Sequence, residues 1–210
     1  MARTRLTREE SRAETRARLL DAAAEVFAEK GFGGAAIEDI AERAGYSRGA
    51  FYSNFTDKDD VFLTLLDERL DQGITDVGRI IVDAHSPEEL LAGLRRRAER
   101  RSVDGTWFLL LNEFRLYALR NRAVRRKLAE RQRKERRALA VGIADLSQSI
   151  GVEPPADPER LALVVQSLDN GMELEGVIDP AGVPRGSFFD ALALLLDASA
   201  ALARERRPRR

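Results

Sequence analysis

The sequence lacks cysteine, contains a single histidine and carries no net charge, because 35 Lys and Arg residues balance 35 Asp and Glu residues. Without cysteine the chain forms no disulfide scaffold, no thiol nucleophile and no cysteine-ligated metal centre. The lone His85 precedes Ser86 and Pro87, a typical helix start, so a Ser-His-Asp catalytic arrangement is disfavoured. The acids at positions 57, 59 and 60 suit a helix start, whose dipole favours negative charge. We therefore expect a protein that is not an enzyme and that needs neither a cofactor nor a metal.

Long apolar runs are also absent. Runs such as residues 191–196 are far shorter than the ~18 residues that a membrane-spanning helix needs. The Arg-rich N-terminus is followed by an apolar stretch that contains Asp21 and Glu25, which is unlike a secretory signal peptide. We expect a cytoplasmic protein without a membrane partner.

One short stretch, residues 37–55, has the pattern of two helices joined by a tight turn. Apolar residues recur at the spacing of one helical face at Ile37, Ile40, Ala41 and Ala44. Gly45 can adopt the positive φ that ends a helix, and Ser47 is a natural N-cap for a second helix. Phe51 and Phe55 follow four positions apart, so both point inward. The outward residues of the second helix are Arg48, Gly49, Tyr52, Ser53 and Asn54.

This pattern favours a helix-turn-helix, in which the second helix enters the major groove of DNA while the first crosses the backbone. The alternative is an ordinary corner between two helices, because periodicity alone does not separate the two interpretations. The residues that flank the turn favour DNA binding.

Those flanking residues resemble the N-terminal domain of the TetR family of bacterial transcriptional regulators. The resemblance covers about residues 12–66 and is carried by Thr15, Arg16, residues 19–23, residues 27–32, Ile40, Ala41, Ala44, Gly45, Ser47, Gly49, Phe51, Tyr52, Phe55, Lys58 and Phe62. It implies an all-α fold in which a three-helix DNA-binding domain precedes a larger helical domain that binds an effector and dimerises. By position it implies phosphate contacts for Tyr52 and Lys58, and it places Tyr46, Arg48, Gly49 and Ala50 at or beside base edges. The expected DNA-binding residues are Thr15, Arg16, Tyr46, Ser47, Arg48, Gly49, Ala50, Tyr52, Ser53, Asn54 and Lys58.

One position departs from the family pattern. Many members have Thr or Ser just before the first helix of the motif, where this chain has Ala35 and Ala36. We therefore expect that helix to lack a side-chain cap, at a cost of ~1 kcal/mol of helix stability.

The rest of the sequence predicts further helices and no strands. Apolar stripes predict helices over residues 58–83, 87–101, 107–119, 123–150, 159–178 and 187–203. We expect a mobile basic arm over residues 1–11, a helix-turn-helix domain over 12–57, an effector-binding and dimerisation domain over 58–204 and a basic tail over 205–210. The Arg-rich segment 93–137 is interpreted as a solvated face, and a second nucleic-acid surface is the alternative.

The last two expected helices are apolar on more than one face, which indicates that something covers them. A second copy of the chain is favoured over the core of a monomer. Polar residues on otherwise apolar helices indicate either ligand contacts or a core network in which Arg115 pairs with Glu113 or Glu173. The expected ligand-binding residues are Trp107, Phe108, Leu111, Asn112, Phe114, Arg115, Tyr117, Gln166, Asn170 and Glu173.

Together these features predict a ligand-responsive transcriptional regulator that binds palindromic double-stranded operator DNA as a homodimer. We expect a repressor, with activation left open, and a small-molecule effector of unknown chemistry. The alternative is an all-helical protein-interaction module that binds no specific DNA.

Overall fold

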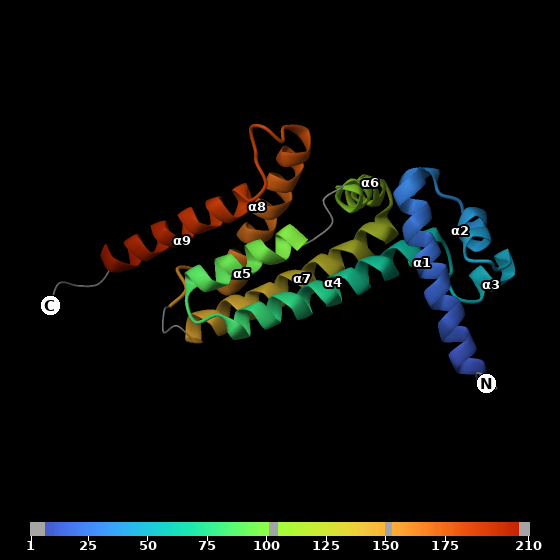
Figure 1. Ribbon diagram of the computed structural model, residues 1–210, viewed down its shortest axis with the longest axis horizontal. Coiled ribbons are helices and arrows are strands. Elements are labelled where there is room, and N and C mark those ends of the chain that lie inside the picture. The colour runs from blue at the N-terminus through green and yellow to red at the C-terminus, as the bar shows by residue number, and fades with distance from the viewer. Residues whose placement is uncertain (1–6, 101–104, 150–152, 206–210) are drawn as a thin grey trace. The chain divides into compact units, whose positions relative to one another are not determined.

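The computed structural model describes residues 7–100, 105–149 and 153–205, and every regular element in these ranges is a helix (Figure 1). This result confirms the all-α prediction. The helices are α1 (Arg8–Gly34), α2 (Ile37–Arg43), α3 (Arg48–Tyr52), α4 (Lys58–Asp83), α5 (Pro87–Arg100), α6 (Thr106–Arg120), α7 (Arg122–Ser149), α8 (Pro158–Ile178) and α9 (Ser187–Glu205).

These helices form two compact units. The first unit comprises the described residues up to Asp71 together with Thr106–Glu130, and it contains α1, α2, α3, α6 and the first parts of α4 and α7. The second unit comprises the described parts of Gln72–Gly105 and Arg131–Arg210. The division differs from the boundary expected at residue 57, because α6 packs against α1 and completes the core around the helix-turn-helix.

Helix α1 begins at Arg8, four residues before the expected start of the domain. Thr7 is its N-cap, with the backbone N–H of Glu10 donating to Thr7 Oγ1 at 3.2 Å and the N–H of Thr7 donating to Glu10 Oε2 at 2.7 Å. These bonds lower the pKa of the Glu10 carboxyl. The capping box therefore makes residues 8–11 of the expected arm helical. Residues 1–6 of the arm and 206–210 of the tail lie outside the described residues.

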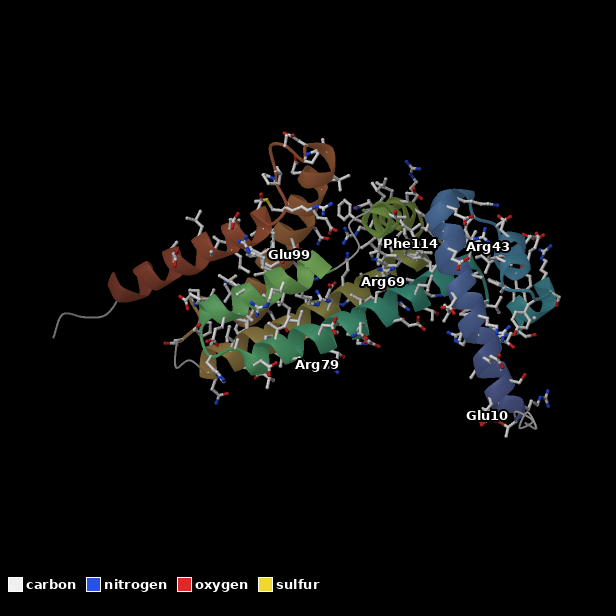
Figure 2. All side chains as sticks on the ribbon, in the orientation of Figure 1. Glu10, Arg43, Arg69, Arg79, Glu99 and Phe114 are labelled. Carbon is white, nitrogen blue, oxygen red and sulfur yellow. The ribbon has the colours of Figure 1, made fainter. Side chains whose placement is uncertain are left out.

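The core of the first unit is aromatic. Phe62 of α4 stacks on Phe114 of α6 with ring centroids 4.2 Å apart, and on Trp107 at 5.6 Å. Phe32 meets Phe62 and Phe114 edge-on, at 5.3 and 4.9 Å. Figure 2 shows Phe114 on α6 and Arg69 on α4, whose guanidinium covers the Trp107 ring at 4.0 Å. Burial of each large side chain here contributes about 1.5–3 kcal/mol to the free energy of unfolding.

In the second unit, α8 packs against α9 and α5 also contacts α9. Ser86 caps α5 by accepting the N–H of Glu89 at 3.1 Å, and Asp157 caps α8 by accepting the N–H of Arg160 at 3.2 Å. Large apolar side chains nevertheless remain exposed on α8 and α9, namely Leu163, Val164, Leu174, Val177, Ile178, Leu194 and Leu195. Among the described residues, no helix combines the length and the apolar character that crossing a bilayer requires.

Candidate DNA-binding interface

The turn between α2 and α3 has the geometry that its sequence predicts. Gly45 adopts φ +74°, a region that favours glycine, and the N–H of Tyr46 donates to Ala41 O at 2.9 Å. Ser47 then caps α3, because its Oγ accepts the N–H of Ala50 at 3.2 Å. The predicted turn and N-cap are confirmed.

Helix α3 has a buried face and an exposed face. Phe51 and Phe55 are fully buried in the first unit, as predicted. Tyr52 is 47% exposed, and Ala50 and Tyr46 are half-buried. The other exposed residues at this end of the motif are Ser47, Arg48, Gly49 and Ser53. The structure thus brings these predicted DNA-contact residues together on one short helix and its cap.

Arg48 is held loosely at the start of this exposed face. Its Nη1 lies 2.9 Å from Glu38 Oε1, and its Nη2 donates to the Tyr52 hydroxyl at 3.5 Å. The hydrogen bond to Tyr52 and the nearby Glu38 carboxylate raise the pKa of Arg48, so the side chain stays charged. Because both partners are solvent-exposed, the guanidinium can exchange them for a base edge or a phosphate with little loss.

Arginines of α1 brace the end of α3 rather than pointing freely outward. Arg16 Nη1 donates to Asn54 O at 2.8 Å, and its guanidinium carbon lies 4.1 Å from the Phe55 ring centroid. Arg12 Nη2 donates to Ser53 O at 3.2 Å. These bonds satisfy carbonyls that the end of a helix leaves without partners. Direct DNA contact by Arg16 and by the neighbouring Thr15 stays a prediction.

Two polar side chains that follow α3 bond back to its carbonyls. Ser53 Oγ donates to Gly49 O, and Asn54 Nδ2 donates to Ala50 O, each at 2.9 Å. Asn54 Oδ1 is buried and accepts no hydrogen bond within the described residues. Both side chains therefore lock the last turn of α3, and their contact with DNA stays a prediction.

Lys58, at the start of α4, binds protein carbonyls in this structure. Its Nζ donates to Phe32 O at 2.6 Å and to Ala35 O at 2.9 Å, and it lies 4.7 Å from the Phe32 ring centroid. Partial burial lowers the pKa of Lys58. The ammonium therefore fixes residues 32–36, the segment that joins the end of α1 to α2. The expected phosphate contact by Lys58 stays a prediction.

The same segment is held from α6 by Glu113. Its carboxylate accepts the N–H of Phe32 at 2.7 Å, just after Gly31 breaks α1 with φ +70° and ψ 170°. A Cβ at Gly31 would lie 2.7 Å from Glu113 Oε2, closer than real Cβ contacts come. A glycine such as Gly31 is typical of a helix end, but nothing local to it in the sequence indicates a partner more than 80 positions away.

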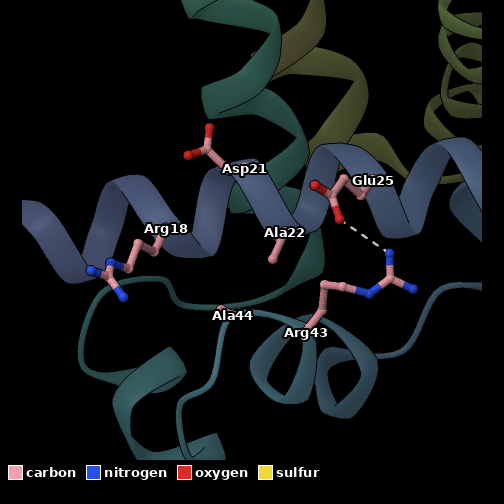
Figure 3. Close-up of a pocket in the computed structure, with 6 residues that line it drawn as sticks. All are labelled: Arg18, Asp21, Ala22, Glu25, Arg43 and Ala44. Carbon is pink, nitrogen blue, oxygen red and sulfur yellow. Dashed lines mark hydrogen bonds and ion pairs between the residues drawn. The ribbon is translucent and has the colours of Figure 1, made fainter.

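Helix α2 is tied to α1 by charge. The expected absence of a side-chain cap at Ala36 is confirmed. Arg43 forms bonds to both oxygens of Glu29, at 2.8 and 2.7 Å, and reaches Glu25 at 3.2 Å. These partners raise the pKa of Arg43, and the bond to Arg43 lowers the pKa of Glu29. Figure 3 shows the link to Glu25 beside a shallow hollow of about 270 Å³, lined by Arg18, Asp21, Ala22, Glu25, Arg43 and Ala44.

The expected ligand-binding residues divide between the two units. In the first unit, Phe108 and Phe114 are buried, and Trp107 and Leu111 pack against the same core. There Asn112 and Arg115 bond within α6, through Asn112 Nδ2 to Phe108 O at 2.8 Å and Arg115 Nη1 to Asn112 Oδ1 at 3.4 Å. The Tyr117 hydroxyl donates to Asp59 of α4 at 3.1 Å.

The remaining members lie on α8 in the second unit. Gln166 Nε2 donates to Glu135 Oε2 at 2.9 Å, and Asn170 Nδ2 donates to Gln166 O at 2.7 Å. Glu173 lies on the same helix. Several predicted ligand contacts are thus used for packing or internal bonds, and ligand binding by this set stays a prediction.

Comparison with known proteins identifies the motif. Residues 19–65 match the family model described as bacterial regulatory proteins, tetR family. The chain is 38% identical over 66 residues to the transcriptional activator FasR of Mycolicibacterium smegmatis. The aligned segment covers 31% of this chain and 30% of FasR. It is also 43% identical over 63 residues to the transcriptional regulator TtgR of Pseudomonas putida, and this aligned segment covers 30% of each chain. The chain thus matches less than a third of the length of either relative.

The fold extends the similarity beyond the motif. GusR of Salmonella enterica superposes with a TM-score of 0.72 at 22% identity, over 92% of this chain and 97% of that one. The likeness concerns the fold and includes the helices after the motif. With the turn at Gly45 and the buried Phe51 and Phe55, the family match over residues 19–65 shows that this part of the chain is a TetR-type helix-turn-helix domain.

Proposed function

We propose that the protein is a transcriptional regulator that binds duplex DNA through the exposed face of α3. The observation that supports this most is the exposed set of Arg48, Gly49, Tyr52 and Ser53 opposite the buried Phe51. A Cβ at Gly49 would meet nothing closer than Ser47 Oγ at 3.7 Å, so the α3 backbone is open to close approach. Regulators of this family are transcription factors rather than enzymes, which agrees with the absence of catalytic patterns in the sequence.

We propose further that the chain acts as a homodimer on a palindromic operator. One five-residue recognition helix offers few base contacts, and a two-fold pair doubles them. The exposed apolar side chains of α8 and α9 supply a surface that a second copy would cover. The two half-sites would then lie about one helical turn of DNA, ~34–36 Å, or a little more apart.

We propose that a small molecule controls this binding, and that bound protein represses by covering a promoter. FasR is named an activator, so the position of the operator, rather than the fold, would set the sign of regulation. Helices α4 and α7 each contribute residues to both units, which supports a physical link between a ligand and the DNA-binding residues. By linkage, an effector must lower DNA affinity by the same factor by which DNA lowers effector affinity, typically ~1–3 kcal/mol.

Selection from a pool of random-sequence duplexes tests the proposal, because the protein itself then picks out the operator sequence that it prefers. We expect the full-length protein to enrich a palindrome, and its affinity for that palindrome to fall steeply as salt rises. If no sequence is enriched and no salt-sensitive binding is found, the protein-interaction module is the better description.

A further inference from the structure

A second cavity of about 560 Å³ opens on the first unit, between the end of α1, the start of α4 and α6. Its lining is Phe32, Gly33, Lys58, Glu113, Leu116, Tyr117 and Arg120. This volume lies within the range of small-molecule sites. Phe32, Leu116 and Tyr117 supply apolar lining, and Leu116 is 60% exposed to solvent. None of these residues except Tyr117 belongs to the ligand-binding set expected from the sequence.

The charges around this cavity favour an anion. The Glu113 carboxylate already accepts the N–H of Phe32, whereas Lys58 has used two of its three N–H groups on carbonyls. Arg120 is exposed and forms no ion pair with any residue that the structure describes. A second carboxylate, that of Asp59, lies beside the lining and accepts the Tyr117 hydroxyl at 3.1 Å, and burial raises its pKa. Both carboxylates are thus engaged, whereas Arg120 has no such partner in the described part of the chain, and a guanidinium is well suited to bind a carboxylate, sulfonate or phosphate group.

We propose that this cavity binds small amphipathic organic anions. The apolar body of the ligand would lie on Phe32, Leu116 and Tyr117. Its acidic group would accept hydrogen bonds from Arg120 and from the third N–H of Lys58.

A ligand in this cavity would touch the segment that joins α1 to α2, which Lys58 and Glu113 hold from α4 and α6. A bound ligand would therefore favour one position of the segment that joins α1 to α2 over its other positions. Any effect of occupancy on DNA affinity rests on the function proposed above, but occupancy itself does not. Binding is therefore measured first in the absence of DNA.

The test uses 1-anilinonaphthalene-8-sulfonate, an aromatic sulfonate whose fluorescence rises in apolar sites, on the full-length protein. The chain has one tryptophan, Trp107, and its ring stacks on Phe62, which contacts the cavity residue Phe32. Excitation of Trp107 should sensitise the emission of bound dye. The neutral analogue N-phenyl-1-naphthylamine serves as a probe without an acidic group.

Two variants of exposed residues alter the cavity, and a third is the matched control. Arg120→Glu reverses the charge at the mouth and Leu116→Ser removes apolar lining, while Arg122→Glu changes a nearby exposed arginine outside the lining. We expect Arg120→Glu and Leu116→Ser each to raise the Kd for the sulfonate about tenfold, and Arg122→Glu to change it less than about twofold. The Kd for the neutral probe should respond to Leu116→Ser but not to Arg120→Glu.

Several results would overturn the proposal. Equal weakening by Arg120→Glu and Arg122→Glu would show general electrostatic attraction only, and indifference to all three variants would place the dye elsewhere. The anion at this site could also be a phosphate of the DNA backbone. If inorganic phosphate or any duplex displaces the dye and Leu116→Ser has no effect, the cavity recognises phosphate and not an amphipathic molecule.

Discussion

Replacement of Gly31 by alanine tests how the end of α1 is fixed to α6. Gly31 combines φ +70° with ψ 170°, a backbone region that is essentially restricted to glycine. Its added Cβ would also push away the Glu113 carboxylate, which lies 2.7 Å from the Cβ position and bonds the N–H of Phe32. Gly45 offers a matched control, because it has φ +74° but no atom within 4 Å of its Cβ position.

The magnitudes separate the two variants. Backbone strain in Gly31→Ala costs about 1–3 kcal/mol, and the lost bond between Glu113 and Phe32 costs about 1–2 kcal/mol more. Gly45→Ala carries only the strain of a left-handed residue, about 1–2 kcal/mol. In a Glu113→Ala background the bond is already absent, so Gly31→Ala should cost about 1–2 kcal/mol less there than in the parent.

Urea unfolding followed by Trp107 emission reports on the first unit, because the single tryptophan packs against its core. We expect a coupling free energy of about 1–2 kcal/mol between positions 31 and 113, and none between positions 45 and 113. Equal destabilisation by Gly31→Ala and Gly45→Ala, together with zero coupling, would refute the assigned role of Glu113.

Three further predictions address the contact of Arg16 with the end of α3, the partly buried carboxyl of Asp59 and the proposed dimer surface. Arg16→Ala should lower the free energy of unfolding by about 1–3 kcal/mol in urea titrations, whereas Arg18→Ala, which loses one exposed ion pair, should change it by less than about 0.5 kcal/mol. Burial raises the pKa of the Asp59 carboxyl above its ordinary 3.8. The protonated carboxyl therefore stabilises the folded state at low pH, and this stabilisation is lost as pH rises through the native pKa. Asp59→Asn should remove the loss when the two proteins are compared by urea unfolding from about pH 3 to pH 7. Leu163→Asp on α8 should convert the proposed dimer to a monomer, which halves the mass measured by sedimentation. Val82 of α4 is 77% exposed, and Val82→Asp should leave the dimer intact. A dimeric Leu163→Asp protein would place the interface elsewhere.

Local patterns predicted the parts of the site that local chemistry determines. Gly45, Ser47 and the pair Phe51 and Phe55 take the roles expected from their spacing, because a turn, a cap and an inward face depend on neighbours within a few positions. The start of α1 at Arg8 was not predicted, although the capping box of Thr7 and Glu10 is visible in the sequence.

Long-range contacts were not predictable in the same way. The aromatic run of α6 was expected to line a ligand site, yet Phe114 is buried beside Phe62 in the first unit, because an apolar pattern does not say which core it enters. Likewise, the sequence marks Arg16 and Lys58 as cations but does not show that backbone carbonyls far along the chain bind them. Their bonds depend on tertiary packing.

The most direct test of the account measures how Arg48 affects discrimination between the selected palindrome and a duplex with scrambled half-sites. Fluorescence anisotropy gives both affinities at several salt concentrations, and Arg79→Ala, an exposed arginine of α4, is the matched control. We predict that the parent prefers the palindrome by about 1,000-fold or more. Arg48→Ala should reduce that preference by about 5- to 100-fold while Arg79→Ala leaves it unchanged. Equal preference in the parent and both variants would contradict the claim that the exposed face of α3 reads the DNA sequence.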